Sequence, residues 1–219
     1  AKIVDIEKII VEPGRVRGTD ENCSVVMHHD QNIPDMPFGS IGLNRLDTFL
    51  SRYEIARTQD NFSIDADTDD DQQFVRSLTF KGKGTKIDYR CANPTTMNRV
   101  PKNIKDQMFV RVPLNGEAIR LLQKGHGAMD NPDVVTLICK NDQVSFELVD
   151  VNNDTFRHNV SKDITILNGD DSSFAYRYPV KLLLSLFRNN PTGYFEIGES
   201  KGVLKFPISD LTIYVLPQV

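Results

Sequence analysis

Alternation of apolar and polar residues along most of the chain predicts β-strands. A strand points successive side chains to opposite faces, so a period of two marks a strand with one buried face. Segments with this pattern are 3–11, 23–29, 74–80, 85–91, 108–112, 134–140, 143–150, 194–198, 201–206 and 211–216. Turn sequences such as KGKG at 81–84 lie between several of them and are typical of hairpins. Antiparallel β-structure is therefore expected to dominate the fold.

Three segments instead space their apolar residues three and four apart, which predicts amphipathic helices. They are 43–53 (LNRLDTFLSRY), 115–126 (NGEAIRLLQKGH) and 178–189 (YPVKLLLSLFRN). Each also carries two basic residues four or seven positions apart, a spacing that places both on one side of a helix. The pairs are Arg45 and Arg52, Arg120 and Lys124, and Lys181 and Arg188. We expect each pair on the face opposite the apolar stripe, which in the first helix is Leu43, Leu46, Phe49, Leu50 and Tyr53.

The order of these elements suggests two similar halves. A helix followed by paired strands occurs in 40–91, in 113–151 and again in 178–216. The segment 93–107 is polar, contains two prolines and has no periodicity, so it is expected to be a linker. The sequence therefore predicts an α+β fold with an N-terminal domain, 1–107 including the linker, and a C-terminal domain, 108–219.

The charge of the chain restricts the kind of partner. The 219 residues carry a net charge of -4, and 26% of them are charged. This balance argues against an indiscriminate, tail-like nucleic-acid binder. Basic pairs gathered on the helices of an acidic protein instead suggest one surface for a polyanion, although Lys and Arg are also ordinary residues on exposed helices. No aromatic residues alternate with these basic ones, so phosphate contact without base readout is expected.

Cysteine usage and hydropathy indicate the compartment. Cys23, Cys91 and Cys139 are odd in number and far apart, so we expect buried free thiols in a reducing environment. No apolar run approaches the roughly 20 residues needed to cross a bilayer, and no leader pattern is present. A cytoplasmic protein is the resulting expectation.

Motifs for catalysis or metal binding are weak. His28 and His29 are strand neighbours that point to opposite faces, and His126 and His158 stand alone, so no metal site is expected. The acidic run 65–71 begins like a calcium loop but has Asp70 at the glycine position and Arg76 in place of the final glutamate, which favours a solvated loop. No nucleotide-binding or nucleophile motif is present, and we expect neither an enzyme nor a cofactor.

One family matches this layout. The stretch 174–219 (FAYRYPVKLLLSLFRNNPTGYFEIGESKGVLKFPISDLTIYVLPQV) has a short helix, two hairpin strands and a hydrophobic last strand ending in Leu-Pro. It resembles the end of a DNA sliding clamp, most closely the T4-type bacteriophage clamp. The segment 42–55 (GLNRLDTFLSRYEI) is similar to the inner helix of the first clamp domain. The segment 112–125 (VPLNGEAIRLLQKG) is similar to the strand and helix that open the second domain.

The resemblance fails at one place. Clamp domains begin with a helix before the first strands, but this chain starts with AKIVDIEKIIVE, which predicts a strand. The first helix of the N-terminal domain is therefore expected to be missing or short.

The resemblance implies a ring that encircles duplex DNA and tethers a replicative polymerase for processive synthesis. With two domains per chain the ring would be a homotrimer, with antiparallel sheets outside and helices on the inner face. It would need an ATP-dependent clamp loader, would read no DNA sequence, and would work in the cytoplasm of an infected bacterium if viral. The six basic residues named above would contact DNA. A pocket for partner peptides would be lined by Val100, Pro101, Tyr214, Leu216 and Pro217.

Ring closure requires strands of neighbouring subunits to pair at their edges. By position, 85–91 of one subunit would lie beside 144–150 of the next, unless both are internal strands. Two other functions stay open at this point. One is a β-rich oligomeric viral structural or assembly protein that does not stimulate a polymerase. The other is an enzyme or ligand-binding β-protein with a cleft assembled in space.

Overall fold

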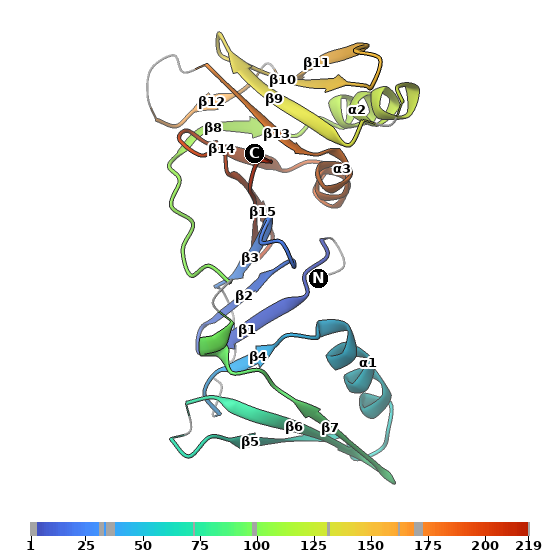
Figure 1. Cartoon of the computed structure of the whole chain (residues 1–219), viewed down its shortest axis with the longest axis vertical. Coiled ribbons are helices and arrows are strands. Elements are labelled where there is room, and N and C mark those ends of the chain that lie inside the picture. The colour runs from blue at the N-terminus through green and yellow to red at the C-terminus, as the bar shows by residue number, and fades with distance from the viewer. Residues whose placement is uncertain are drawn as a thin grey trace. The chain divides into compact units, whose positions relative to one another are not determined.

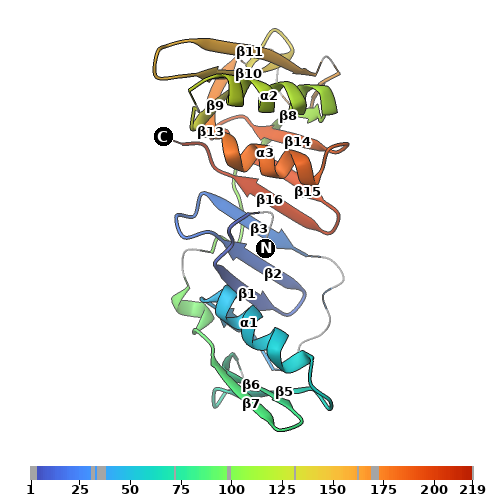
Figure 2. The ribbon, with the colours of Figure 1, turned by 90° about the vertical axis from the view of Figure 1, so that its right-hand side faces the viewer.

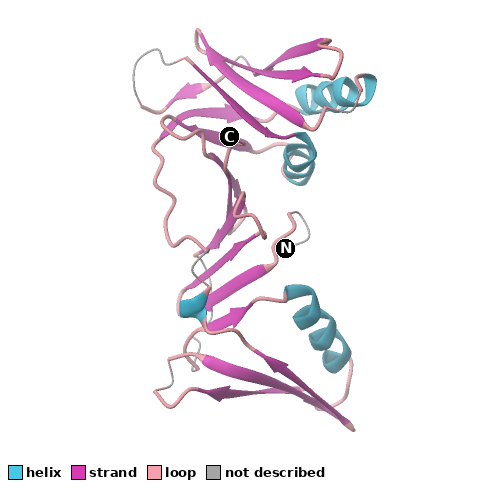
Figure 3. Cartoon of the chain, in the orientation of Figure 1, coloured by secondary structure: helices cyan, strands magenta, loops and turns pink. Residues whose placement is uncertain are grey.

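The computed structural model describes residues 4–30, 33, 38–71, 73–97, 100–130, 132–161, 163–168 and 173–218. The chain forms two compact units (Figure 1), one from Asp5–Asn103 and the other mostly from Ile104–Val219. Each combines antiparallel sheets with short helices (Figure 3), so the predicted α+β class is confirmed. The unit boundary and the predicted boundary after residue 107 both fall in the linker; the two domains 1–107 and 108–219 stay a prediction.

The N-terminal unit contains two sheets and one α-helix. The first sheet has the strand order β3-β2-β1-β4 and the second the order β5-β6-β7. The helix α1 packs on the second sheet, where the Phe49 ring meets Phe80 and Tyr89 edge-on at centroid distances of 5.7 and 5.4 Å. The bounds are Lys8–Glu12 (β1), Arg15–Thr19 (β2), Val25–His29 (β3), Ile41–Leu43 (β4), Leu46–Arg57 (α1), Ser63–Thr68 (β5), Val75–Gly82 (β6), Thr85–Arg90 (β7) and Pro94–Thr96 (the short 3₁₀ helix η1).

The C-terminal unit also contains two sheets, with the orders β11-β10-β9-β13 and β12-β8-β14-β15-β16. A cluster of fully buried aromatic rings joins them: Phe187 of α3 lies 5.9 Å from Phe146 and 5.6 Å from Phe195 between ring centroids. The bounds are Met108–Pro113 (β8), Gly116–Ala128 (α2), Val134–Lys140 (β9), Gln143–Val149 (β10), Thr155–Ser161 (β11), Thr165–Ile166 (β12), Phe174–Pro179 (β13), Val180–Asn189 (α3), Tyr194–Gly198 (β14), Leu204–Ile208 (β15) and Leu211–Val215 (β16).

The two units share one order of elements. A three-stranded meander gains a fourth strand, a helix follows, and three further antiparallel strands complete the second sheet. This order is β1–β4, α1 and β5–β7 in the first unit. In the second it is β9–β11, β13, α3 and β14–β16. The second unit also has β8 and α2 before its meander, whereas no helix precedes β1 among the residues that the structure describes.

The first helix begins later than predicted. The expected helix started at Leu43, but Ile41–Leu43 forms β4, whose residues pair with Ile9–Val11 of β1. This long-range pairing overrides the helical spacing, so α1 starts at Leu46 and runs on to Arg57. Of the predicted stripe, Leu46 is buried within the helix and Leu43 is buried within the strand.

The prediction of a solvated loop over the acidic run 65–71 is partly wrong. Asp65 and Asp67 belong to β5, which pairs with β6 along its length. The side chain of Asp65 forms an ion pair with Lys81 of that neighbouring strand. An acidic sequence is compatible with this position because β5 is an outer strand with largely exposed side chains.

A substitution in α2 tests how closely this helix packs on β11. A Cβ atom added at Gly125 would lie 2.6 Å from the Phe156 ring, whereas nothing lies within 4 Å of a Cβ at Gly127 of the same helix. Gly125→Ala is therefore expected to lower the free energy of unfolding by about 1–3 kcal/mol through overpacking. Gly127→Ala, the matched control, should leave it unchanged or raise it by up to about 1 kcal/mol. Urea unfolding of both variants measures the difference, and equal effects would contradict the packing.

Candidate nucleic-acid interface

Two helices of the C-terminal unit lie side by side (Figure 2). Helix α2 buries Ala118, Ile119, Leu122 and Gly125, and α3 buries Val180, Leu183, Leu184, Leu186 and Phe187. Their apolar stripes face the core of the unit, which leaves the opposite surfaces of both helices to the solvent.

Those solvent-facing surfaces are basic. Arg120 and Lys124 of α2 and Lys181 and Arg188 of α3 are exposed, as predicted from their spacing. Within the described ranges none of these four side chains forms a hydrogen bond or an ion pair. Helix α3 contains no acidic residue and α2 contains only Glu117 in its first turn. The helix pair therefore presents uncompensated positive charge that can contact phosphates.

Sequence features at the helix ends fix these positions. The Asn115 side chain accepts a hydrogen bond from the backbone N–H of Glu117 at 2.9 Å, and this cap starts α2. Arg188 lies in the last turn of α3, where the partial negative charge of the helix end favours a cation.

The basic pair of the first helix behaves differently. Arg45 precedes α1 and donates to the backbone oxygen of Arg90 at 3.1 Å; Arg52 donates to the backbone oxygen of Asp88 at 2.8 Å. Both guanidinium groups lie over the ring of Tyr89, 5.3 and 5.8 Å from its centre. The expectation that this pair lies opposite the apolar stripe is wrong, because Tyr89 also contacts Phe49 of that stripe.

These arginines border a hollow that the sequence did not reveal. Its volume is about 530 Å³, and its lining includes four arginines, among them Arg76 and Arg90. Asp67, Ser77 and Asp88 complete the lining, and Arg76 pairs with Asp70 at 3.2 Å. Arg76 and Arg90 stand in strands, so helical spacing could not identify them; only the pairing of β6 with β7 brings them to the helix.

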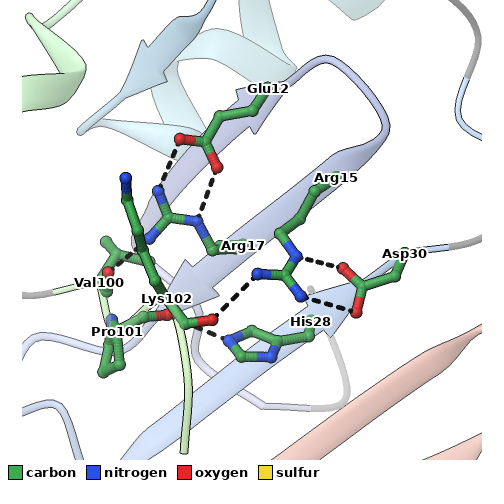
Figure 4. A network of polar contacts seen from close by, with 8 residues as sticks. All are labelled: Glu12, Arg15, Arg17, His28, Asp30, Val100, Pro101 and Lys102. Atoms are coloured by element: carbon green, nitrogen blue, oxygen red, sulfur yellow. Dashed lines mark hydrogen bonds and ion pairs between the residues drawn. The ribbon is translucent and has the colours of Figure 1, made fainter.

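Side chains of the first sheet hold the linker in place through a network of hydrogen bonds (Figure 4). Three consecutive backbone oxygens of the linker accept hydrogen bonds: Val100 from Arg17 at 2.6 Å, Pro101 from His28 at 3.1 Å and Lys102 from Arg15 at 3.0 Å. Arg17 also binds both carboxylate oxygens of Glu12 at 2.9 Å, and Arg15 binds Asp30. Since a carbonyl can only accept, His28 must carry its proton on Nε2.

Because His28 belongs to this hydrogen-bond network, the stability of the folded chain depends on pH. Burial lowers the pKa of His28 from its ordinary value of 6.5, and the nearby Arg15 and Arg17 charges act in the same direction, outweighing the bond to Pro101 and the charge of Asp30, which raise it. The unfolded chain therefore binds more protons than the folded one near pH 6. We expect stability to be full above about pH 6.5 and to fall as the pH drops below that value. Urea midpoints between pH 5 and 8 measure this, and His28→Gln should flatten the profile; an identical profile in that variant would contradict the role of His28.

The residues predicted to line a peptide pocket occupy different settings. Val100 is buried with Ile10 and Met97 in a small apolar cluster, and Pro101 is half-buried. Tyr214 lies in β16, and Leu216 and Pro217 follow this strand, all of them half-buried. That these five residues form one pocket stays a prediction.

The prediction that 85–91 of one subunit pairs with 144–150 of the next needs a correction. The segment 144–150 contains most of β10, which pairs with β9 on one side and with β11 on the other. Its backbone groups are therefore already used within the sheet. The outer strand is β11, which the sequence did not predict because its exposed side chains hide the alternation. In the N-terminal unit β7 is an outer strand, as expected for 85–91.

In the part of the chain that the structure describes, thiols and potential metal ligands add no second site. Cys139 is buried, whereas Cys23 and Cys91 are only half-buried, so the expectation of buried thiols holds for one of the three. Burial raises the pKa of the Cys91 thiol to about 11, which keeps it unreactive near neutral pH. Among the described residues no three His, Cys, Asp or Glu side chains gather in a way that could hold a metal ion. Likewise, no described helix is long and apolar enough to span a membrane.

Comparisons with known proteins identify the architecture. The sequence matches no family model and no curated protein. The structure is similar to that of Caulobacter crescentus pol III beta, with a TM-score of 0.67 at 10% identity over 99% of this chain and 59% of that one. It is also similar to PCNA of Thermococcus kodakaraensis, with a TM-score of 0.60 at 14% identity over 99% of this chain and 92% of that one.

A third structure is that of A. fulgidus PCNA with the C-terminal region of FEN-1 bound. Its TM-score is 0.60 at 11% identity, over 99% of this chain and 90% of that one. The chain thus spans most of the length of these PCNA chains but only about three-fifths of the bacterial beta subunits. The chain has two similar units, each with antiparallel sheets and short helices. This architecture and its neighbours in structure show that the chain has the fold of DNA sliding clamps.

Proposed function

We propose that this protein is a sliding clamp that encircles duplex DNA and tethers a replicative DNA polymerase for processive synthesis. The observation that carries the proposal is the pair of helices α2 and α3, whose four exposed cations have no partner among the described residues. A protein that slides needs attraction to phosphates without a fixed register. Cations on helix surfaces, with no group placed to read bases, supply that attraction. The protein would act as a scaffold and not as an enzyme.

The ring would be a homotrimer. Two outer strands support this assembly: β7 in the N-terminal unit and β11 in the C-terminal unit each have one neighbouring strand among the described residues. Pairing β7 of one subunit with β11 of the next would close the ring and use both edges. The helices would then line the inner face and the sheets the outer face.

Protein partners belong to the same proposal. The C-terminal region of FEN-1 is bound to A. fulgidus PCNA, a neighbour in fold. For this chain we propose that polymerase peptides use the pocket predicted at Val100, Pro101, Tyr214, Leu216 and Pro217. An ATP-dependent loader would open the ring. The resemblance of 174–219 to T4-type clamps supports a bacteriophage protein that acts in the cytoplasm of its host.

The alternative is a β-rich viral structural or assembly protein that oligomerises without stimulating a polymerase. Both functions accommodate the sheets, but the structural role gives no reason for four unpaired cations on neighbouring helices. The mass of the assembly and its shape separate the two.

Light scattering over a dilution series is the first test. The chain has a mass of 24.8 kDa, so we expect a species near 74 kDa. Electron microscopy of that species should show a closed ring with a central hole. A shell, a filament or a persistent monomer would argue against the clamp.

A further inference from the structure

One edge of β7 is free of strand pairing within the described residues, since β6 is its sole neighbour in the sheet. The backbone N–H of Cys91, just after β7, donates to the oxygen of Arg76 on β6 at 2.9 Å. The N–H and C=O groups of successive residues alternate between the two edges of a strand. In β7 the N–H and C=O groups of the odd-numbered residues therefore face β6. Lys86, Asp88 and Arg90 therefore direct their N–H and C=O groups to the free edge.

Two arginines cover this edge. The guanidinium of Arg52 donates to the oxygen of Asp88 at 2.8 Å, and that of Arg45 donates to the oxygen of Arg90 at 3.1 Å. Both side chains lie over the ring of Tyr89, the residue between these two positions. Two of the three outward carbonyls of β7, those of Asp88 and Arg90, are thus already occupied by side chains from the same chain.

We propose that Arg45 and Arg52 guard the free edge of β7 and leave it when β11 of a second copy pairs there. This inference rests on the proposed ring, but it concerns what each subunit does before the ring closes. A charged side chain at a sheet edge discourages premature pairing with other chains. The guard would keep free subunits apart until a strand with matching N–H groups displaces the guanidiniums.

The structure indicates β11 as the incoming strand. Within the described residues β11 has β10 as its one neighbour, so a row of its backbone groups is available. At the other end of that sheet, β13 is partly covered because Gln218 donates its N–H to the oxygen of Arg177. At the other end of the sheet that contains β7, the outer strand β5 carries Asp65 and Asp67, so the β5 edges of two copies would repel each other.

Displacement of Arg45 and Arg52 from the β7 edge would also release two cations. Arg45 and Arg52 border the hollow that Arg76 and Arg90 share, so the freed guanidiniums join positive charge already gathered there. Strand pairing would then raise the affinity for a polyanion. By thermodynamic linkage, a polyanion that draws the arginines off the edge must favour strand pairing by the same factor.

The test compares self-association of the wild-type chain with that of Arg45→Ala/Arg52→Ala by analytical ultracentrifugation. Since two hydrogen bonds no longer have to break, we expect the variant to associate roughly tenfold more tightly. Arg57→Ala/Lys83→Ala is the matched control, because it removes two exposed charges of the same unit whose side chains form no hydrogen bond with the β7 backbone within the described residues; it should behave as wild type. Arg45→Gln/Arg52→Gln keeps part of each stem on Tyr89 and should change association in the same direction if the alanine variant folds poorly.

Each outcome decides the question. Equal or weaker association of both guard variants would overturn the guard, while a wild-type trimer would still support the clamp. A wild-type chain that stays monomeric while the guard variants assemble would support the guard and count against the proposed trimer. If neither wild type nor variants associate, an uncovered edge does not pair and the guard is wrong. A short duplex DNA should promote wild-type assembly more strongly than that of the guard variants, which keep the cations of α2 and α3; an equal effect on both would overturn the linkage.

Discussion

Replacing the four exposed cations of α2 and α3 with alanine is expected to lower the affinity for duplex DNA at least about tenfold at low salt. The positions are Arg120, Lys124, Lys181 and Arg188, which have no partner among the described residues. Removal of one phosphate-binding cation should reduce the slope of log affinity against log salt by roughly 0.9. Fluorescence anisotropy with two duplexes of unrelated sequence measures both quantities, and the two duplexes should respond equally because no bases are read.

The control for this variant removes the same charge from other surfaces. Four exposed lysines outside the helices serve for it: Lys83, Lys105, Lys140 and Lys201. If DNA binding depends on net charge alone, both variants will show the same decrease in affinity, and the assignment of the helix surface is then wrong. A normal assembly mass in both variants would show that the decrease does not come from a broken ring.

The largest effect on stability is expected from Arg17→Met. Arg17 is 3% exposed, binds Glu12 through two hydrogen bonds and donates to the buried oxygen of Val100. The substitution leaves a carboxylate and a linker carbonyl without their donor, which should lower the free energy of unfolding by about 3 kcal/mol. Urea unfolding of the whole chain measures the change.

Arg15 provides a close comparison for Arg17 in the same network. It also binds one carboxylate, of Asp30, and one linker carbonyl, of Lys102, but its side chain is 35% exposed. Water can replace these bonds, so Arg15→Met should cost less than about 1 kcal/mol. Equal destabilisation by the two variants would show that burial does not decide the strength of the network.

The alternation of residues predicted those strands whose burial comes from their own apolar side chains. β9 and β14 occur at the predicted residues, 134–140 and 194–198. β2 was missed because its sequence, RVRGT, reads as polar: Arg17 is buried with its charge satisfied by Glu12 and by a backbone oxygen of the linker. β11 was missed because an outer strand with exposed side chains needs no alternation.

The candidate site also contains residues that the local pattern predicts and residues that it does not. Spacing along α2 and α3 sufficed for the exposure of their basic residues, since each helix packs through its own apolar stripe. For Arg45 and Arg52 it did not, because their partners lie on β7, more than 30 residues away in the sequence. Contacts of this range depend on how the helix meets the sheet, and no local pattern encodes that.

The linker has a final consequence for protein engineering. Its first part is fixed by the bonds to Val100, Pro101 and Lys102, and near its end the Asp106 carboxylate accepts hydrogen bonds from the backbone N–H groups of Ser200, Lys201 and Val203. Only the residues 103–105 lie between these two anchors. Extra residues inserted there would stretch neither anchor, whereas the same insertion at Pro101 would pull a carbonyl off its donor. Fluorescent or affinity tags carried in the linker therefore belong between Asn103 and Lys105.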